Sequence, residues 1–149
     1  MEQLTPLPTG TITFLFTDIE GSTRLVQRLG DRYGGILELH QDILRTSFGG
    51  RGGVEFGSEG DALFVVFSDA RAAVSAALDA QRQLETYPWP EEARVRVRMG
   101  IHTGAGVLGG GSYVGVDVHR AARISAAAHG GQVLVSESTR ALIEHDPPD

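Results

Sequence analysis

Short apolar runs alternate with longer amphipathic segments along the chain, and this pattern predicts which parts form strands. A strand buried on both faces shows a continuous run of apolar and β-branched residues, whereas a strand with one exposed face alternates. Residues 11–16 form a run of the first kind, and 94–101, in which arginine alternates with apolar residues, is of the second. The segment 54–67 predicts a β-hairpin that turns at 58–61. Residues 132–136 predict a last short strand.

Apolar residues recur at the spacing of a helix face in the segments between these strands. Glycine-rich or proline-rich stretches separate them, as at 49–53 and at the YPWP of 87–90. The alanine-rich segment 116–131 is expected to end in a glycine C-cap. The five predicted helices begin at an N-cap on Ser22, after Asp31, at a cap on Ser68 or Asp69, within 116–131, and at the start of 138–145.

The predicted order of elements is therefore βααββαβαβα. A hairpin in the middle of the chain, with helices between the other strands, favours the α+β class. We expect an α/β sandwich with a mixed or antiparallel sheet and its helices on one face. We expect one domain at 10–145, with short tails at 1–9 and 146–149.

Composition narrows the classes of protein without selecting one. A length of 149 residues suits one domain, and 41% hydrophobic and 21% charged residues are typical of a soluble globular protein. A net charge of −6 argues against a nucleic-acid partner. The absence of cysteine excludes disulfides, thiolate metal sites and cysteine nucleophiles. No run approaches the ~18 apolar residues of a membrane span, and no signal peptide is recognisable, so we expect a cytoplasmic protein without a membrane partner.

Two acidic residues are expected at one edge of the sheet. Asp18 follows the first predicted strand, and Asp61 lies in the hairpin turn. Two carboxylates and a backbone carbonyl make an oxygen-rich site of the kind that Mg²⁺ or Mn²⁺ binds together with phosphates. Asp18 is also explained as an acid that favours a helix N-terminus, and Asp61 as an ordinary turn residue.

Groups that bind phosphate lie near these acids. The small residues Gly21, Ser22 and Thr23 open a helix, where backbone N–H groups attract an anion. His119 and Arg123 share one helix face, and an arginine so placed can neutralise charge that develops on phosphorus. Taken alone, Ser22 and Thr23 are also explained as common N-cap residues, and Arg123 as a solvated surface arginine.

Four segments together resemble the catalytic domain of class III adenylate/guanylate cyclases. They are FLFTDIEGST, GSEGDALFVVF, VRMGIHTG and VGVDVHRAARISAAAHGGQVLVS, and they span residues 10 to about 145. The resemblance implies a ferredoxin-like βαββαβ core with an added αβ unit, and a head-to-tail homodimer with its sites at the interface. It also implies that the domain's usual C-terminal hairpin, which bears a triphosphate-binding lysine, is absent here.

The resemblance implies a role for each matching residue. Asp18, Asp61 and the Ile19 carbonyl match the ligands of two Mg²⁺ or Mn²⁺ ions. Arg98 matches an arginine that contacts the triphosphate, and Arg123 matches a transition-state arginine donated by the partner subunit. The backbone that cradles the phosphates comprises Ile19, Glu20, Gly21, Ser22 and Thr23.

Three positions depart from the family pattern. Gly57 replaces the lysine that selects the purine base, and Ser112 replaces its base-selecting partner. His119 replaces the asparagine that orients the ribose, and an imidazole can donate or accept the same hydrogen bond.

These features leave two functional hypotheses. The first is a purine nucleotidyl cyclase, a lyase that converts ATP or GTP to the 3′,5′-cyclic nucleotide and pyrophosphate. The second is a weak or inactive cyclase-homology domain that binds nucleotide or dimerises for regulation. A related diguanylate cyclase is disfavoured because the chain has no GGDEF-like segment.

Overall fold

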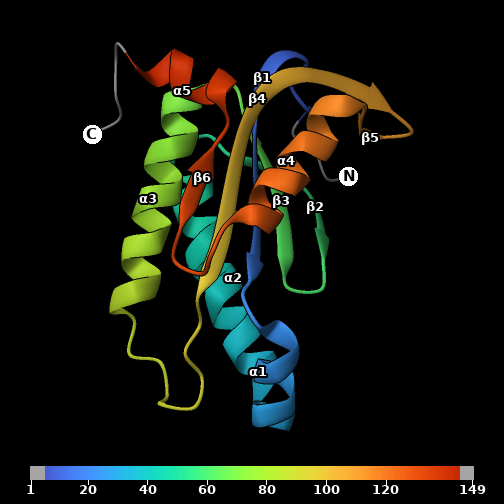
Figure 1. The fold of residues 1–149 in the computed structure, drawn as a ribbon. Helices are drawn as coiled ribbons and strands as arrows, with labels where there is room; N and C mark the ends of the chain where they lie inside the picture. The colour runs from blue at the N-terminus through green and yellow to red at the C-terminus, as the bar shows by residue number, and fades with distance from the viewer. Residues whose placement is uncertain (1–5, 145–149) are drawn as a thin grey trace.

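The computed structural model describes residues 6–144, which form one sheet covered by helices (Figure 1). The predicted tail residues 1–5 and 146–149, and the end of the last predicted helix at 145, lie outside the described residues. The strands are β1 (Gly10–Ile19), β2 (Val54–Glu59), β3 (Ala62–Phe67), β4 (Val97–Gly109), β5 (Ser112–Val114) and β6 (Val133–Val135). The helices are α1 (Ser22–Leu29), the 3-10 turn η1 (Gly30–Arg32), α2 (Tyr33–Gly49), α3 (Ala70–Thr86), α4 (Val116–Ala127) and α5 (Glu137–Ile143).

The sheet has the strand order β2-β3-β1-β4-β5, and β6 pairs in parallel with β4. All neighbours along that path are antiparallel. The order places β1 in the centre, between β3 and β4. The order β2-β3-β1-β4, with helices after β1 and β3, is the ferredoxin-like βαββαβ core. The segment β5–α4–β6 is the added αβ unit. The predicted fold class is confirmed.

The two faces of the sheet bury different side chains. Helices α1, α2 and α3 cover one face with aliphatic residues and alanines, such as Leu44 and Ala77. The other face is aromatic, and Phe14, Phe16 and Tyr113 pack there against α4 through Ala121. The expectation that all helices lie on one face is therefore wrong.

Helix α4 can cover the aromatic face of the sheet because it lies very close to β4. A Cβ at Gly100 would collide with the backbone of Ser125, so only glycine lets the helix lie this near the strand. In Figure 1, α4 crosses the sheet on the side opposite α2 and α3. The alanine-rich composition that predicted a helix also lets it pack closely.

Helix ends were predicted with mixed success. Asp69 caps α3 as expected, and its carboxylate accepts a hydrogen bond from the Arg71 N–H at 3.2 Å. Ser22 is not the N-cap of α1, because Gly21 occupies that position with a left-handed φ of 67°. Helix α4 ends at an extended Ala128, not at a glycine. Within residues 6–144, no helix combines the length and apolar character needed to cross a membrane.

Strand β4 starts later and continues much further than the predicted strand at 94–101. Its second half contains several glycines, which hide a strand from pattern analysis. Gly110 and Gly111 both have positive φ, at 62° and 84°, and form the two-residue turn into β5.

Candidate active site

Asp18 and Arg98 are bound to each other at one end of the sheet. They face each other across the β1–β4 pair, and the Arg98 Nε and Nη2 donate to the two Asp18 carboxylate oxygens, each at 2.6 Å. Both side chains are half-buried. Hydrogen bonding to Asp18 raises the pKa of Arg98, so the guanidinium stays charged. Two of the predicted site residues thus form a bidentate ion pair.

Asp61 lies at the same end of the sheet, in the β2–β3 turn. Its Oδ2 accepts a hydrogen bond from the Ile19 N–H at 2.5 Å, across 42 positions of sequence. Asp61 therefore joins the hairpin turn to the residue that follows Asp18. The structure brings together the two acids that the sequence predicted to meet.

The donors at this edge fit a hard divalent cation that is shared with phosphate. Asp18, Asp61 and the Ile19 carbonyl offer only oxygen ligands. Among the described residues, no cluster of three or more His, Cys, Asp or Glu side chains that could hold a metal occurs. Mg²⁺ typically binds one or two carboxylates and takes its other ligands from water and substrate phosphates. Two carboxylates therefore suit a cation that arrives with a nucleotide.

The start of α1 presents backbone N–H groups without a side-chain cap. Gly21 adopts the left-handed conformation, and no side chain accepts from the first turn of α1. The first N–H groups of a helix need an outside acceptor, so those of Ser22 and Thr23 are available to an anion. The Glu20 carboxylate faces elsewhere, because it accepts from the Gly130 N–H at 3.0 Å.

Gly57 and Ser112, the two positions predicted to face the base, lie on different strands. Gly57 is on β2 next to a bulge, and a Cβ there would lie 3.2 Å from the Phe64 ring. A lysine at this position would therefore require the ring to shift slightly. Ser112 is half-buried at the start of β5. Within residues 6–144, neither residue forms a hydrogen bond or an ion pair with Asp18 or Asp61.

His119 and Arg123 are exposed on α4, one turn apart. Arg123 lines a cavity of about 490 Å³ together with His102, Asp117 and Ser136. Asp18 and Asp61 do not line this cavity. Within one chain, Arg123 therefore faces a different space from the two acids.

Sequence analysis missed a polar network that fastens α4 to β4. The Asp117 carboxylate contacts His102 Nε2 at 2.6 Å and accepts from the Ala105 N–H at 2.9 Å. The other His102 ring nitrogen contacts the Ser136 hydroxyl at 2.8 Å. These hydrogen bonds, first that of His102 and then that of Ala105, lower the pKa of Asp117. An acid in the first turn of a helix is readily explained by the helix dipole, so nothing in the sequence indicated this pairing.

Replacing Asp117 with asparagine is expected to destabilise the fold by about 1–2 kcal/mol at neutral pH, because charge-assisted hydrogen bonds to β4 are lost. The folded-state pKa of Asp117 lies below its ordinary value of 3.8. Its contribution is therefore full above that value and disappears as pH falls through the folded-state pKa. Urea unfolding of the wild type and D117N at neutral and acidic pH measures the difference. D79N, which alters a half-buried acid on α3 that lies 3.9 Å from Arg51, is the control. A gap between wild type and D117N that widens in acid contradicts the assignment.

The fold is an α+β domain with a ferredoxin-like core. At one edge of its sheet it presents two carboxylates and the free backbone N–H groups of a helix start. The family model of the adenylate and guanylate cyclase catalytic domain matches residues 4–147. The chain belongs to this family.

Relatives with similar sequences are mostly much longer than this chain. An adenylate cyclase of Lachancea kluyveri is 33% identical over 87% of this chain, which corresponds to 8% of the yeast protein. An uncharacterized protein of Mycobacterium bovis is 36% identical over 91% of this chain and 46% of its own length. The chain thus spans less than half of each of these relatives.

Solved cyclase structures share the fold. The adenylyl cyclase CyaB from P. aeruginosa matches with a TM-score of 0.78 and 26% identity, over 94% of this chain and 84% of that one. The guanylate cyclase domain of RhGC from Catenaria anguillulae, solved in complex with GTP, matches with a TM-score of 0.78 and 25% identity. That match covers 90% of this chain and 82% of the other.

Proposed function

We propose that this chain is the catalytic domain of a purine nucleotidyl cyclase, which converts ATP or GTP to the 3′,5′-cyclic nucleotide and pyrophosphate. The observation that carries the proposal is the hydrogen bond from the Ile19 N–H to Asp61, which brings this acid to the residue that follows Asp18, next to the uncapped start of α1. Family membership and the adenylate cyclases among its relatives support the reaction.

Asp18, Asp61 and the Ile19 carbonyl would hold two Mg²⁺ or Mn²⁺ ions. Such ions favour deprotonation of the ribose 3′-hydroxyl and offset the charge of the triphosphate. The backbone from Ile19 to Thr23 accommodates phosphate oxygens through N–H groups that need an outside acceptor. Each residue in this half of the site comes from one chain.

Arg98 has two anionic partners in this scheme. In the free chain it neutralises Asp18 through two short hydrogen bonds. A triphosphate beside α1 also offers pairs of oxygens that accept two parallel hydrogen bonds from a guanidinium. Exchange of Asp18 for a phosphate oxygen keeps the guanidinium paired and leaves the carboxylate available as a ligand.

Arg123 acts in the site of the partner subunit. It lies on the exposed side of α4 and lines a cavity that excludes both acids, so it needs a second copy to reach a substrate. A head-to-tail homodimer with two-fold symmetry supplies Arg123 to both sites. There its charge stabilises the transition state of phosphoryl transfer.

The reaction is tested directly by incubating the protein with Mn²⁺ or Mg²⁺ and either ATP or GTP, and measuring cyclic nucleotide and pyrophosphate. We expect equal amounts of the two products. We also expect weak discrimination between the bases, because Gly57 and Ser112 lack the side chains that select them. Nucleotide binding without any cyclic product contradicts the catalytic proposal.

Replacing His119 with alanine is expected to lower turnover by about tenfold, if its imidazole orients the ribose through one hydrogen bond. H119N, which restores the family's asparagine, should retain or raise activity. The measurement is kcat and KM for cyclic product formation with each variant. Unchanged turnover and nucleotide affinity in the alanine variant contradict this role.

A regulatory module that binds nucleotide without turnover is the second candidate. Gly57 favours it, because a side chain that selects a base is missing there and the Phe64 ring would have to shift slightly to admit one. This candidate predicts nucleotide binding and dimerisation with no product. The product assay described above therefore distinguishes the two.

A further inference from the structure

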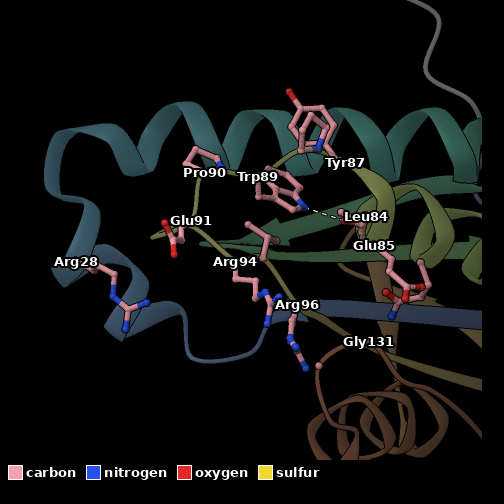
Figure 2. Close-up of a pocket in the computed structure, with 14 residues that line it drawn as sticks. Arg28, Leu84, Glu85, Tyr87, Trp89, Pro90, Glu91, Arg94, Arg96 and Gly131 are labelled. Atoms are coloured by element: carbon pink, nitrogen blue, oxygen red, sulfur yellow. Dashed lines mark hydrogen bonds between the residues drawn. The ribbon is translucent and has the colours of Figure 1, made fainter.

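A second, larger cavity lies between α1, the end of α3 and the start of β4. Its volume is about 990 Å³, within the range of small-molecule sites. Figure 2 shows its walls, formed by Arg28 of α1, the 87–96 segment after α3, and Gly131 after α4. Neither Asp18 nor Asp61 lines it. The cavity is thus separate from the acids of the proposed active site.

Three arginines line this cavity, and within residues 6–144 none of them forms an ion pair with a carboxylate. In the segment before β4, buried Ala93, Val95 and Val97 alternate with exposed Arg94 and Arg96. Among the described residues, neither arginine forms an ion pair or a side-chain hydrogen bond.

Arg28 lies across the cavity from this pair (Figure 2). Among the described residues, its side chain donates only to the Glu92 carbonyl, at 3.5 Å. The glutamates that line the cavity, Glu85 and Glu91, are paired with none of the three arginines within residues 6–144. The arrangement leaves guanidinium groups on two sides of one space.

An aromatic surface is held in place beside these arginines. The Trp89 Nε1 donates to the Leu84 carbonyl at 2.8 Å, which fixes the indole at the end of α3. The Tyr87 ring lies 4.5 Å from it, centroid to centroid, at an angle of 48°. Trp89 is half-buried and packs partly on the main core. An anchored indole offers a flat surface on which a nucleobase can stack.

We propose that this cavity is a second nucleotide site, which binds a nucleoside phosphate with its base on Trp89 and its phosphates on Arg28, Arg94 and Arg96. Arginine suits phosphate because its planar group donates two parallel hydrogen bonds. In this mode the phosphates are bound by arginines and need no ion held by carboxylates. Binding there therefore requires no divalent metal, which separates it from binding at the proposed active site.

Trp89 is the only tryptophan in the chain, so its fluorescence reports on this cavity alone. The experiment titrates the full chain in EDTA with ATP, adenosine and pyrophosphate. We expect saturable quenching by ATP, no saturation by adenosine over the same range, and competition by pyrophosphate with little quenching of its own.

Variants separate the cavity from the active site and from general charge effects. The double variant R94Q/R96Q is expected to weaken ATP binding about a hundredfold, or tenfold for each lost contact. Both positions are exposed, so the fold should tolerate glutamine. R82Q, on α3 outside the cavity, should bind as the wild type does. D61N should also bind ATP normally in EDTA.

The proposal would be overturned by no saturable quenching by ATP, by equal quenching in R94Q/R96Q, or by binding of adenosine as tight as that of ATP. Binding of a glutamate-rich peptide without binding of ATP would also overturn it, and would assign the cavity to a protein partner. Because the assay needs no turnover, its failure leaves the cyclase proposal intact.

Discussion

Replacing Asp61 with asparagine is expected to lower cyclic nucleotide formation by at least about a thousandfold, since loss of a metal ligand removes several kcal/mol of transition-state stabilisation. Asparagine keeps the shape of the side chain, and its carbonyl oxygen can still accept from the Ile19 N–H. The fold should therefore remain stable to within about 1 kcal/mol. The measurement is kcat with Mn²⁺, together with thermal unfolding of the same sample.

D69N is the matched control for this variant. Asp69 caps α3 away from the site, and asparagine is an equally good N-cap, so activity and stability should both be retained. If D61N keeps more than about a tenth of wild-type turnover, Asp61 is a turn residue and the metal assignment is wrong.

Replacing Arg123 with alanine is expected to lower kcat by about a thousandfold and to change KM little. An arginine that contacts only the transition state contributes to the rate and not to ground-state binding. Arg123 is exposed on α4 and forms no ion pair among residues 6–144, so its loss should not affect folding. Steady-state kinetics with each nucleotide measures the effect.

R120A is the control on the same helix. Arg120 is also exposed, but it lies 3.8 Å from the Asp117 carboxylate and outside the proposed catalytic groups. It should retain activity to within a few fold. An equal loss in both variants indicates a general role of positive charge on α4 and contradicts the specific role of Arg123.

Sequence patterns correctly predicted the elements whose positions depend on neighbouring residues in the chain. The continuous apolar run at 11–16 lies within the central strand β1, and the hairpin strand at 62–67 matches β3 residue for residue. The Asp69 cap and the YPWP breaker correctly bounded α3. A continuous apolar run, a turn or a cap decides each of these within a few residues.

Features that depend on distant contacts were not predicted. The position of α4 on the second face depends on the space left by Gly100, whose meaning appears only when Ser125 is known to approach it. The His102–Asp117 contact likewise requires α4 to lie over β4. The continuation of β4 beyond residue 101 was hidden by glycines that pack against neighbouring side chains, as Gly106 does against Ile12.

The sequence predicted which residues form the candidate site, but not which of them bind to each other. The sequence indicated that Asp18 and Asp61 would lie at one edge, and the structure places both beside Ile19. It did not indicate that Asp18 would be held by Arg98, since each was expected to face a different part of a ligand. Roles for metal, nucleotide and partner subunit remain predictions for the measurements proposed here.

Mixing two inactive variants tests the central claim, that one site is built from two chains. Equal amounts of D61N and R123A should give heterodimers in half of the population, and each heterodimer has one site with both native residues. Activity should therefore return to about a quarter of the wild-type value at the same total concentration. If Asp61 and Arg123 act within one chain, every chain in the mixture is defective. Activity would then stay at the level of the separate variants, and the shared-site account would be wrong.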